Sequence, residues 1–208
     1  MKPSEPTVFI VDDDQAMRDA LSWLIQSVNL QVQTFASAEE FLGRYDQSLP
    51  GCLVLDVRMP GMSGLKLQEE LAARGRALPI IMLTGYAEVP TAVRALKQGA
   101  IDFLNKPFSD ALLLDRVAEA IEIDKQRRLA EQQRADVRAR YEALTPRERD
   151  VMRLVIDGKA NKVIASDLGL SPRTVEVHRA SVMRKMSAES VADLVRSALL
   201  IDPPPTPR

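Results

Sequence analysis

The chain has 208 residues, of which 46% are apolar and 27% charged, so it is long enough for one or two folded domains and is not disordered throughout. One cysteine, Cys52, and one histidine, His178, exclude an intramolecular disulfide framework, a cysteine-built zinc site and a histidine-rich metal centre. The net charge of -1 conceals an asymmetry, because residues 1–124 hold 11 basic and 18 acidic side chains whereas residues 125–208 hold 17 and 11. This asymmetry indicates two modules with different partners, and the basic half points toward nucleic acid.

The chain shows no pattern typical of export or membrane insertion. Its first residues lack the apolar core of a signal peptide, and no apolar run approaches the roughly 20 residues of a membrane span. We therefore expect a soluble, cytoplasmic protein.

The first half alternates short apolar runs with amphipathic stretches, at a spacing of roughly 20–25 residues that suits one strand and one helix. Continuous apolar runs are typical of parallel strands that are buried on both faces. The five expected strands are 8–11, 31–35, 52–55, 79–83 and 102–104. Between them, Ser37 and Glu40 form a capping box that begins a helix. The pattern predicts an α/β domain over residues 1–124, with a doubly wound, five-stranded parallel sheet of the flavodoxin type.

A long helix is expected next, because the chain contains no proline or glycine from Ser109 to about Leu144. Its start is amphipathic and suits packing on the sheet, but the chain becomes highly charged after Glu122. Residues 125–142 are therefore predicted to form a helical linker. A coiled-coil seam is the alternative, through Leu129, Val137, Tyr141 and Leu144. Gln133 interrupts that seam, which favours a solvated spacer.

Four short helical patterns follow and predict an all-α, four-helix domain over residues 143–202. Thr145 and Glu148 form a capping box with Pro146 at the first helical position. Gly169 ends the second pattern, and Pro172 begins the third, which runs to about residue 186. The tail, residues 203–208, is rich in proline and is predicted to be disordered.

Polar residues follow four of the five predicted strands, and their order is informative. Asp12 and Asp13 follow the first strand, Asp56 the third, Thr84 the fourth and Lys106 the fifth. In a doubly wound sheet these strand ends meet at one edge. Clustered carboxylates require a cation, and all-oxygen ligands suit Mg²⁺, or Mn²⁺ in its place. A carboxylate beside such a metal ion can attack phosphorus, while Lys106 neutralises phosphoryl oxygens and Thr84 donates a hydrogen bond.

Four strings of the first domain closely resemble the receiver domain of bacterial response regulators. They are VDDD at 11–14, LDVRMPGMSG at 55–64, LTG at 83–85 and DFLNKPF at 102–108, and the resemblance covers residues 7–123. It implies that Asp56 accepts a phosphoryl group from a partner histidine kinase. It also implies a Mg²⁺ site made by Asp13, Asp56 and the backbone carbonyl of Arg58, with Asp12 acting mainly through a water molecule.

The same resemblance assigns roles to the last two strand ends. Lys106 is expected to contact the phosphoryl group, and the peptide bond to Pro107 is expected to be cis. Thr84 and Phe103 match the switch pair, in which the hydroxyl moves toward phosphate and the ring is repositioned. An ordinary place in the core is the alternative for Phe103.

The basic half resembles the helix-turn-helix domain of the LuxR/NarL/FixJ family over residues 143–201. The matching strings are LTPRERDVM at 144–152, NKVIA at 161–165 and LSPRTVEVHR at 170–179. The third helix is then the recognition helix, whose N-terminal part enters the major groove. By helix face, the groove residues are Glu176, Val177, Arg179 and Ala180. The candidates for phosphate contact are Lys162, Arg173, Thr174 and Arg184.

The two resemblances together imply a two-component response regulator of the FixJ-type branch, a transcription factor and not an enzyme. Phosphorylation of Asp56 is expected to promote dimerisation and DNA binding, and thereby to activate transcription. The expected partners are a cognate sensor histidine kinase, double-stranded DNA, RNA polymerase and a second copy of the chain, with no membrane. Occlusion of the recognition helix by the unphosphorylated receiver is the alternative to control by dimerisation.

Two other functions compete with this one. A Mg²⁺-dependent, dehalogenase-like phosphohydrolase also uses Asp, Thr and Lys at strand ends, but it needs an acid two residues after the nucleophile, where this chain has Arg58. The third hypothesis is a regulator that ignores phosphate and responds to a protein or small ligand. The intact set of strand-end residues argues against it.

Overall fold

The computed structural model describes residues 5–75, 78–85 and 89–201, and the chain divides into two compact units, Met1–Arg128 and Leu129–Arg208. The predicted disordered tail, 203–208, lies outside the described residues. Within the described ranges, every helix is too short or too polar to cross a membrane.

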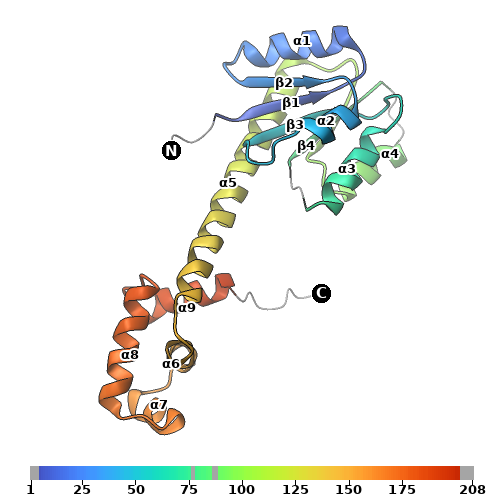
Figure 1. Ribbon diagram of the computed structural model, residues 1–208. Helices are drawn as coiled ribbons and strands as arrows, with labels where there is room; N and C mark the ends of the chain where they lie inside the picture. Colours follow the sequence, from blue (N-terminus) through green and yellow to red (C-terminus); the bar gives the residue numbers. More distant parts are fainter. Residues whose placement is uncertain (1–4, 76–77, 86–88, 202–208) are drawn as a thin grey trace. The chain divides into compact units, whose positions relative to one another are not determined.

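The first unit is built on a five-stranded sheet with the strand order β2-β1-β3-β4-β5, and all its pairings are parallel (Figure 1). The strands are β1 (Thr7–Val11), β2 (Gln31–Phe35), β3 (Gly51–Asp56), β4 (Ile80–Thr84) and β5 (Asp102–Asn105). Every residue of β1 and β3 is buried, as expected of central strands covered on both faces. The strand order reverses between β1 and β3. In sheets of this kind the ligand-binding crevice lies outside the carboxyl ends of the two strands at which the order reverses. The predicted doubly wound sheet is confirmed.

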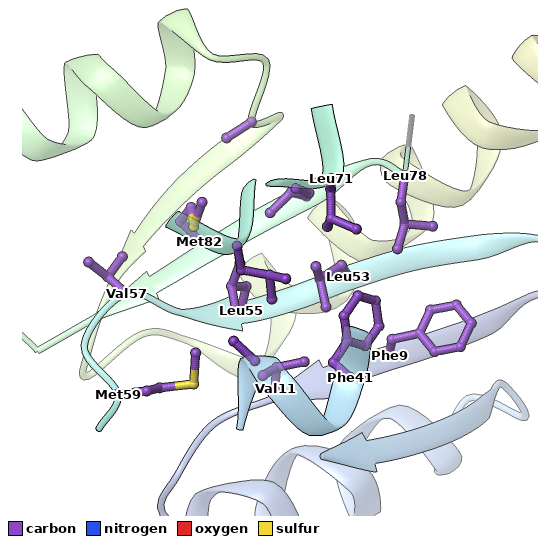
Figure 2. Close-up of a cluster of buried hydrophobic side chains, with 14 of the residues drawn as sticks. Phe9, Val11, Phe41, Leu53, Leu55, Val57, Met59, Leu71, Leu78 and Met82 are labelled. Atoms are coloured by element: carbon purple, nitrogen blue, oxygen red, sulfur yellow. The ribbon is translucent and has the colours of Figure 1, made fainter. Parts of the chain in front are cut away.

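Helices cover both faces of this sheet. They are α1 (Gln15–Gln26), α2 (Ala38–Arg44), α3 (Gly64–Ala73), α4 (Val89–Lys97) and α5 (Asp110–Glu142). One core holds Leu21 and Ile25 of α1 together with Leu113 and Val117 of α5. The other core, shown in Figure 2, packs strand residues such as Leu53 against helix residues that include Phe41 and Leu71. Each fully buried side chain of this size contributes about 1.5–3 kcal/mol, and the two cores together fix the edge where β1, β3 and β5 end.

The long helix forms as expected, and α5 is continuous from Asp110 to Glu142. Residues 129–136 are all exposed, as expected of a solvated spacer, but the expectation does not hold for the end of the predicted linker. Val137 and Leu144 are buried in the core of the second unit, and Tyr141 packs against it. The apolar stripe that suggested a coiled-coil seam is thus covered within the chain, because it faces the short helices that follow.

The second unit contains α6 (Pro146–Ile156), α7 (Asn161–Leu168), α8 (Pro172–Lys185) and α9 (Val191–Ile201). The capping box of Thr145 and Glu148 is present, and Gly169 ends α7 in the left-handed conformation with φ 64°. The core of this unit includes Val151, Val155, Ile164, Val175, Val182 and Leu194. Val163, next to Ile164 on α7, is exposed and lies outside this core. The remaining domain boundaries of the sequence analysis stay predictions.

Candidate functional site

Three side chains from different strand ends meet at the carboxyl edge of the sheet. The Nζ atom of Lys106 lies 2.7 Å from Oδ2 of Asp12 and 2.6 Å from Oδ1 of Asp56. Asp12 follows β1, Asp56 ends β3 and Lys106 follows β5. Both carboxylates are buried, with Asp12 1% and Asp56 6% exposed. One ammonium group therefore bridges two buried carboxylates.

Backbone groups fix the orientation of both carboxylates. The backbone N–H of Asp14 donates to Oδ1 of Asp12 (2.9 Å), and that of Arg58 donates to Oδ2 of Asp56 (2.7 Å). The buried guanidinium of Arg18 donates to the backbone oxygen of Asp12 (2.6 Å) and holds the end of β1 from α1. Each carboxylate thus uses one oxygen for Lys106 and the other for a backbone amide. Arg18 was not among the predicted site residues, although its place on the apolar face of an amphipathic helix is a signal in the sequence.

Burial and the shared Lys106 contact shift the pKa values of this pocket. Burial raises the pKa of Asp56, although the hydrogen bond and charge of Lys106 act in the opposite direction. Burial by itself would lower the pKa of Lys106, but its hydrogen bonds to Asp12 and Asp56 outweigh that effect and raise it. Lys106 is therefore charged, and its ammonium group is shared by the carboxylates of Asp12 and Asp56.

The other predicted pocket residues lie around this trio. Thr84 is buried at the end of β4, and its backbone oxygen accepts a hydrogen bond from the N–H of Lys106 (2.7 Å). Phe103 is half-buried and packs against the core that contains Leu53. The peptide bond between Lys106 and Pro107 is cis, as the resemblance implied.

Asp13 follows Asp12 in the chain and Arg58 lies two residues after Asp56, and both side chains are exposed. In the part of the chain that the structure describes, no three His, Cys, Asp or Glu side chains are gathered closely enough to form a ready metal site. The structure thus brings Asp12, Asp56 and Lys106 together, whereas Asp13 is exposed.

The candidate DNA-binding residues lie on α8 and at the start of α7. The residues expected to contact phosphates are Lys162, Arg173, Thr174 and Arg184. Thr174 is half-buried and the other three are exposed. The residues expected in the major groove are Glu176, Val177, Arg179 and Ala180, and all but Arg179 are exposed. Arg179 is half-buried because its Nη1 donates to Oδ1 of Asn161 (2.9 Å). His178 is half-buried as well, in agreement with a packing role.

Thr174 is also held locally. Its backbone N–H donates to Oγ of Ser171 (3.1 Å), and the two hydroxyl oxygens lie 2.8 Å apart. Ser171 is the N-cap of α8, so this contact fixes the first turn of the helix. The N-terminal part of α8 therefore presents an ordered surface of mixed charge.

Comparison with known proteins identifies both units. Residues 8–118 match the response regulator receiver domain, and residues 142–198 match the bacterial regulatory proteins of the LuxR family. The chain is 47% identical to the transcriptional regulatory protein FixJ of Azorhizobium caulinodans, over 95% of this chain and 94% of the relative. The chain belongs to the FixJ-type branch of the LuxR-family response regulators.

Other relatives of this family agree with that assignment. Nodulation protein W of Bradyrhizobium diazoefficiens is 49% identical, over 91% of this chain and 83% of the relative. Among solved structures, the response regulator StyR is 42% identical and superposes with a TM-score of 0.87, covering 94% of this chain and 98% of the other. As a FixJ-type response regulator, the protein is a transcriptional regulator of a two-component system, with a receiver and a LuxR-type DNA-binding domain. Such regulators act with a cognate kinase and with DNA, and the family points to a regulator instead of an enzyme.

Proposed function

We propose that Asp56 of this FixJ-type regulator accepts a phosphoryl group from a cognate sensor histidine kinase, and that the modification promotes dimerisation and DNA binding. The observation that carries the proposal is the contact of Lys106 with both Asp12 and Asp56 at the carboxyl edge of the sheet. When a buried carboxylate accepts a phosphoryl group, a fixed ammonium group beside it is already in place to stabilise the negative charge of that group.

The residues of the pocket fit a Mg²⁺ ion, or Mn²⁺ in its place. Receiver domains in general bind Mg²⁺, and the oxygens of the two buried carboxylates that share Lys106 are of the kind that Mg²⁺ prefers as ligands. Asp12, Asp13, Asp56 and the backbone carbonyl of Arg58 are the proposed ligands. Mg²⁺ retains several waters and needs few protein ligands, so an exposed Asp13 beside two buried carboxylates is compatible with its coordination. When bound, the ion supplies charge neutralisation to the phosphoryl oxygens.

The transfer uses groups that already meet at the strand ends. A carboxylate oxygen of Asp56 forms a bond to phosphorus, the bond from phosphorus to the imidazole nitrogen of the kinase breaks, and that nitrogen keeps the electron pair. Lys106, now 2.6 Å from Asp56, donates to a phosphoryl oxygen of the product. The Thr84 hydroxyl donates a second hydrogen bond, and Phe103 is repositioned with it. These assignments make Thr84 and Phe103 the switch pair of the proposed mechanism.

The DNA-binding unit gives the output. Glu176, Val177, Arg179 and Ala180 of α8 are proposed to meet base edges in the major groove, and Lys162, Arg173, Thr174 and Arg184 to meet phosphates. Phosphorylation is proposed to pair two copies on a two-fold DNA site and to activate transcription together with RNA polymerase in the cytoplasm. The alternative, relief of an occluded recognition helix, predicts DNA binding by the phosphorylated monomer.

The test combines mass, oligomeric state and DNA binding. The protein is incubated with Mg²⁺ and acetyl phosphate or phosphoramidate, with Asp56→Asn as the control. We expect a gain of about 80 Da in the wild type only, which is one phosphoryl group. The phosphorylated form should also sediment as a dimer and bind operator DNA more tightly. A wild type that stays monomeric would overturn the dimer step, and a wild type that gains no mass under folded conditions would favour a regulator that ignores phosphate.

A further inference from the structure

A third buried carboxylate of the receiver, that of Asp124, takes no part in the proposed phosphotransfer. Asp124 of α5 is 1% exposed, and its Oδ2 accepts a hydrogen bond from the backbone N–H of Gly51 (2.9 Å). Arg127 and Arg128, one turn further along α5, form ion pairs with Asp124 at 2.5 and 2.7 Å. A charge buried this far is retained only when donors surround it, and here three donors do so.

Arg128 extends this cluster to the loop before β3. Its Nε donates to Asp124, while Nη1 donates to the backbone oxygen of Ser48 (3.2 Å) and Nη2 to those of Gln47 (3.1 Å) and Leu49 (2.6 Å). These carbonyl groups belong to a turn and gain a partner from the guanidinium fork. Lysine has no planar fork and cannot reproduce this set of contacts. We name Gly51, Asp124 and Arg128 the clasp.

The position of the clasp in the chain is distinctive. Gly51 begins β3, and Asp56, the proposed phosphoacceptor, ends the same strand. On the other side, Arg128 is the last residue of the first unit, and residues 129–136 of α5 are all exposed. A helical segment of this length without packing is marginal in water, so its stability depends on the packed turns of α5 on either side of it. The clasp therefore lies where a packed helix becomes an unpacked one.

We propose that Asp124 is a positioning residue for signal output, which acts through the clasp to fix the last receiver turn of α5 to the strand that carries Asp56. The inference rests on the proposed function of Asp56. When the contacts of the clasp are formed, the conformational change that follows phosphorylation of Asp56 acts on a helix that is held at residues 124–128. When the contacts of the clasp are broken, the unpacked segment unwinds back toward residue 124. Phosphorylation of the receiver then has a smaller effect on the DNA-binding unit.

The test compares Arg128→Lys and Asp124→Asn with a matched control in the full chain. Arg128→Lys keeps the charge and removes the fork, so it remains informative if Asp124→Asn fails to fold. The control is Lys125→Ala, which lies on the same turn but removes only an exposed ion pair with Glu122. Three quantities are measured for each protein: the mass gain with phosphoramidate, the ratio of operator affinities with and without phosphorylation, and hydrogen exchange at residues 125–136.

We expect all these variants to gain the phosphoryl mass as the wild type does. In both clasp variants the affinity ratio should fall by at least about fivefold, and exchange at residues 125–131 should be faster, whereas Lys125→Ala leaves both unchanged. Clasp variants that keep the wild-type ratio, and lose only thermal stability, would overturn the proposal. Unchanged exchange at residues 125–131 would overturn it as well. Failure of the proposed function is distinguishable, because the wild type itself would then gain no mass.

Discussion

Glu148 of α6 and Lys185 of α8 form the ion pair that ties the start of the DNA-binding unit to the end of its third helix, with Nζ 2.7 Å from Oε2. The Glu148 side chain is 7% exposed. It also accepts hydrogen bonds from Oγ of Ser181 (2.7 Å) and from the backbone N–H of Thr145 (2.8 Å). This carboxylate therefore joins the N-cap of α6 to the C-terminal half of α8.

Acid should loosen the DNA-binding unit through Glu148. The hydrogen bonds of Lys185, Ser181 and Thr145 lower the pKa of Glu148 from 4.5 to about 2. Because the folded state holds the lower pKa, its contribution to stability is present above about pH 4.5 and is lost as the pH falls toward 2. Glu148→Gln should cost about 1–3 kcal/mol at pH 7 and flatten the acid dependence of hydrogen exchange in α6 and α8.

The control for this prediction is Glu189→Gln, because Glu189 is exposed. It should retain both the stability and the acid slope of the wild type. A Glu148→Gln variant whose exchange still rises with acid as steeply as that of the wild type would show that another group is responsible.

Mg²⁺ should stabilise the receiver through the Asp56 pocket. At about 100 times its Kd, the ion should add about 2.7 kcal/mol to the unfolding free energy, because only the folded state offers the site. Asp56→Asn and Asp13→Asn should lose most of this gain, while Asp115→Asn, at an exposed position of α5, should keep it. Thermal unfolding followed by circular dichroism, with and without the ion, measures the effect; equal gains in all four proteins would contradict the proposed ligands.

Without metal, Asp56→Asn should be more stable than the wild type at pH 7. Burial raises the pKa of Asp56, so the folded protein holds this carboxylate in its charged form at a cost in free energy. That cost applies above the raised pKa and disappears as the carboxyl group is protonated. The difference in melting temperature between the two proteins should therefore shrink as the pH is lowered. A difference that stays constant with pH would contradict a free-energy cost from the charged Asp56 carboxylate.

The salt dependence of DNA binding should separate the two classes of contact. Lys162→Ala and Arg173→Ala should each weaken binding to all sequences and reduce the slope of log K against log salt by about 1. Val177→Ala should instead change the preference among operator sequences, because an exposed apolar side chain in the groove meets base edges. Arg134→Ala, in the exposed segment of α5, is the matched charge control for fluorescence anisotropy titrations. A Lys162→Ala variant with the wild-type slope would remove Lys162 from the phosphate contacts.

Gly51 should tolerate no side chain. It has a φ of +149°, and a Cβ atom there would lie 1.7 Å from the backbone oxygen of Thr7 on the neighbouring strand. Gly51→Ala is therefore expected to cost about 2–4 kcal/mol in chemical denaturation, since β1 and β3 must separate. The control is Gly43→Ala in α2, where a Cβ would meet nothing within 4 Å. Gly43→Ala should stabilise the protein by about 0.5–1 kcal/mol. Equal effects of Gly51→Ala and Gly43→Ala would contradict the close approach of residue 51 to the backbone oxygen of Thr7.

The elements of this fold were predictable because their signals are local. Apolar runs identified the strands, and the capping box of Thr145 and Glu148 placed the start of α6. The strand-end residues Asp56 and Lys106 were also identifiable, because the carboxyl ends of parallel strands share one edge and the motifs resemble a known family. Such patterns depend only on neighbours within a few residues, so one sequence is sufficient to read them.

Other features required the tertiary structure. Gly51 and Asp124 are 73 residues apart, and no local pattern pairs a strand's first amide with a carboxylate on a distant helix. Arg18 is buried because it holds the backbone of Asp12 across the packed face of α1. Val137 looked like part of a seam between chains, and its burial was decided by the helices that follow it. The sequence by itself determined the secondary structure, the domain types and the acidic pocket; which buried charges are paired, and which apolar stripe is covered, depended on long-range packing that only the folded chain establishes.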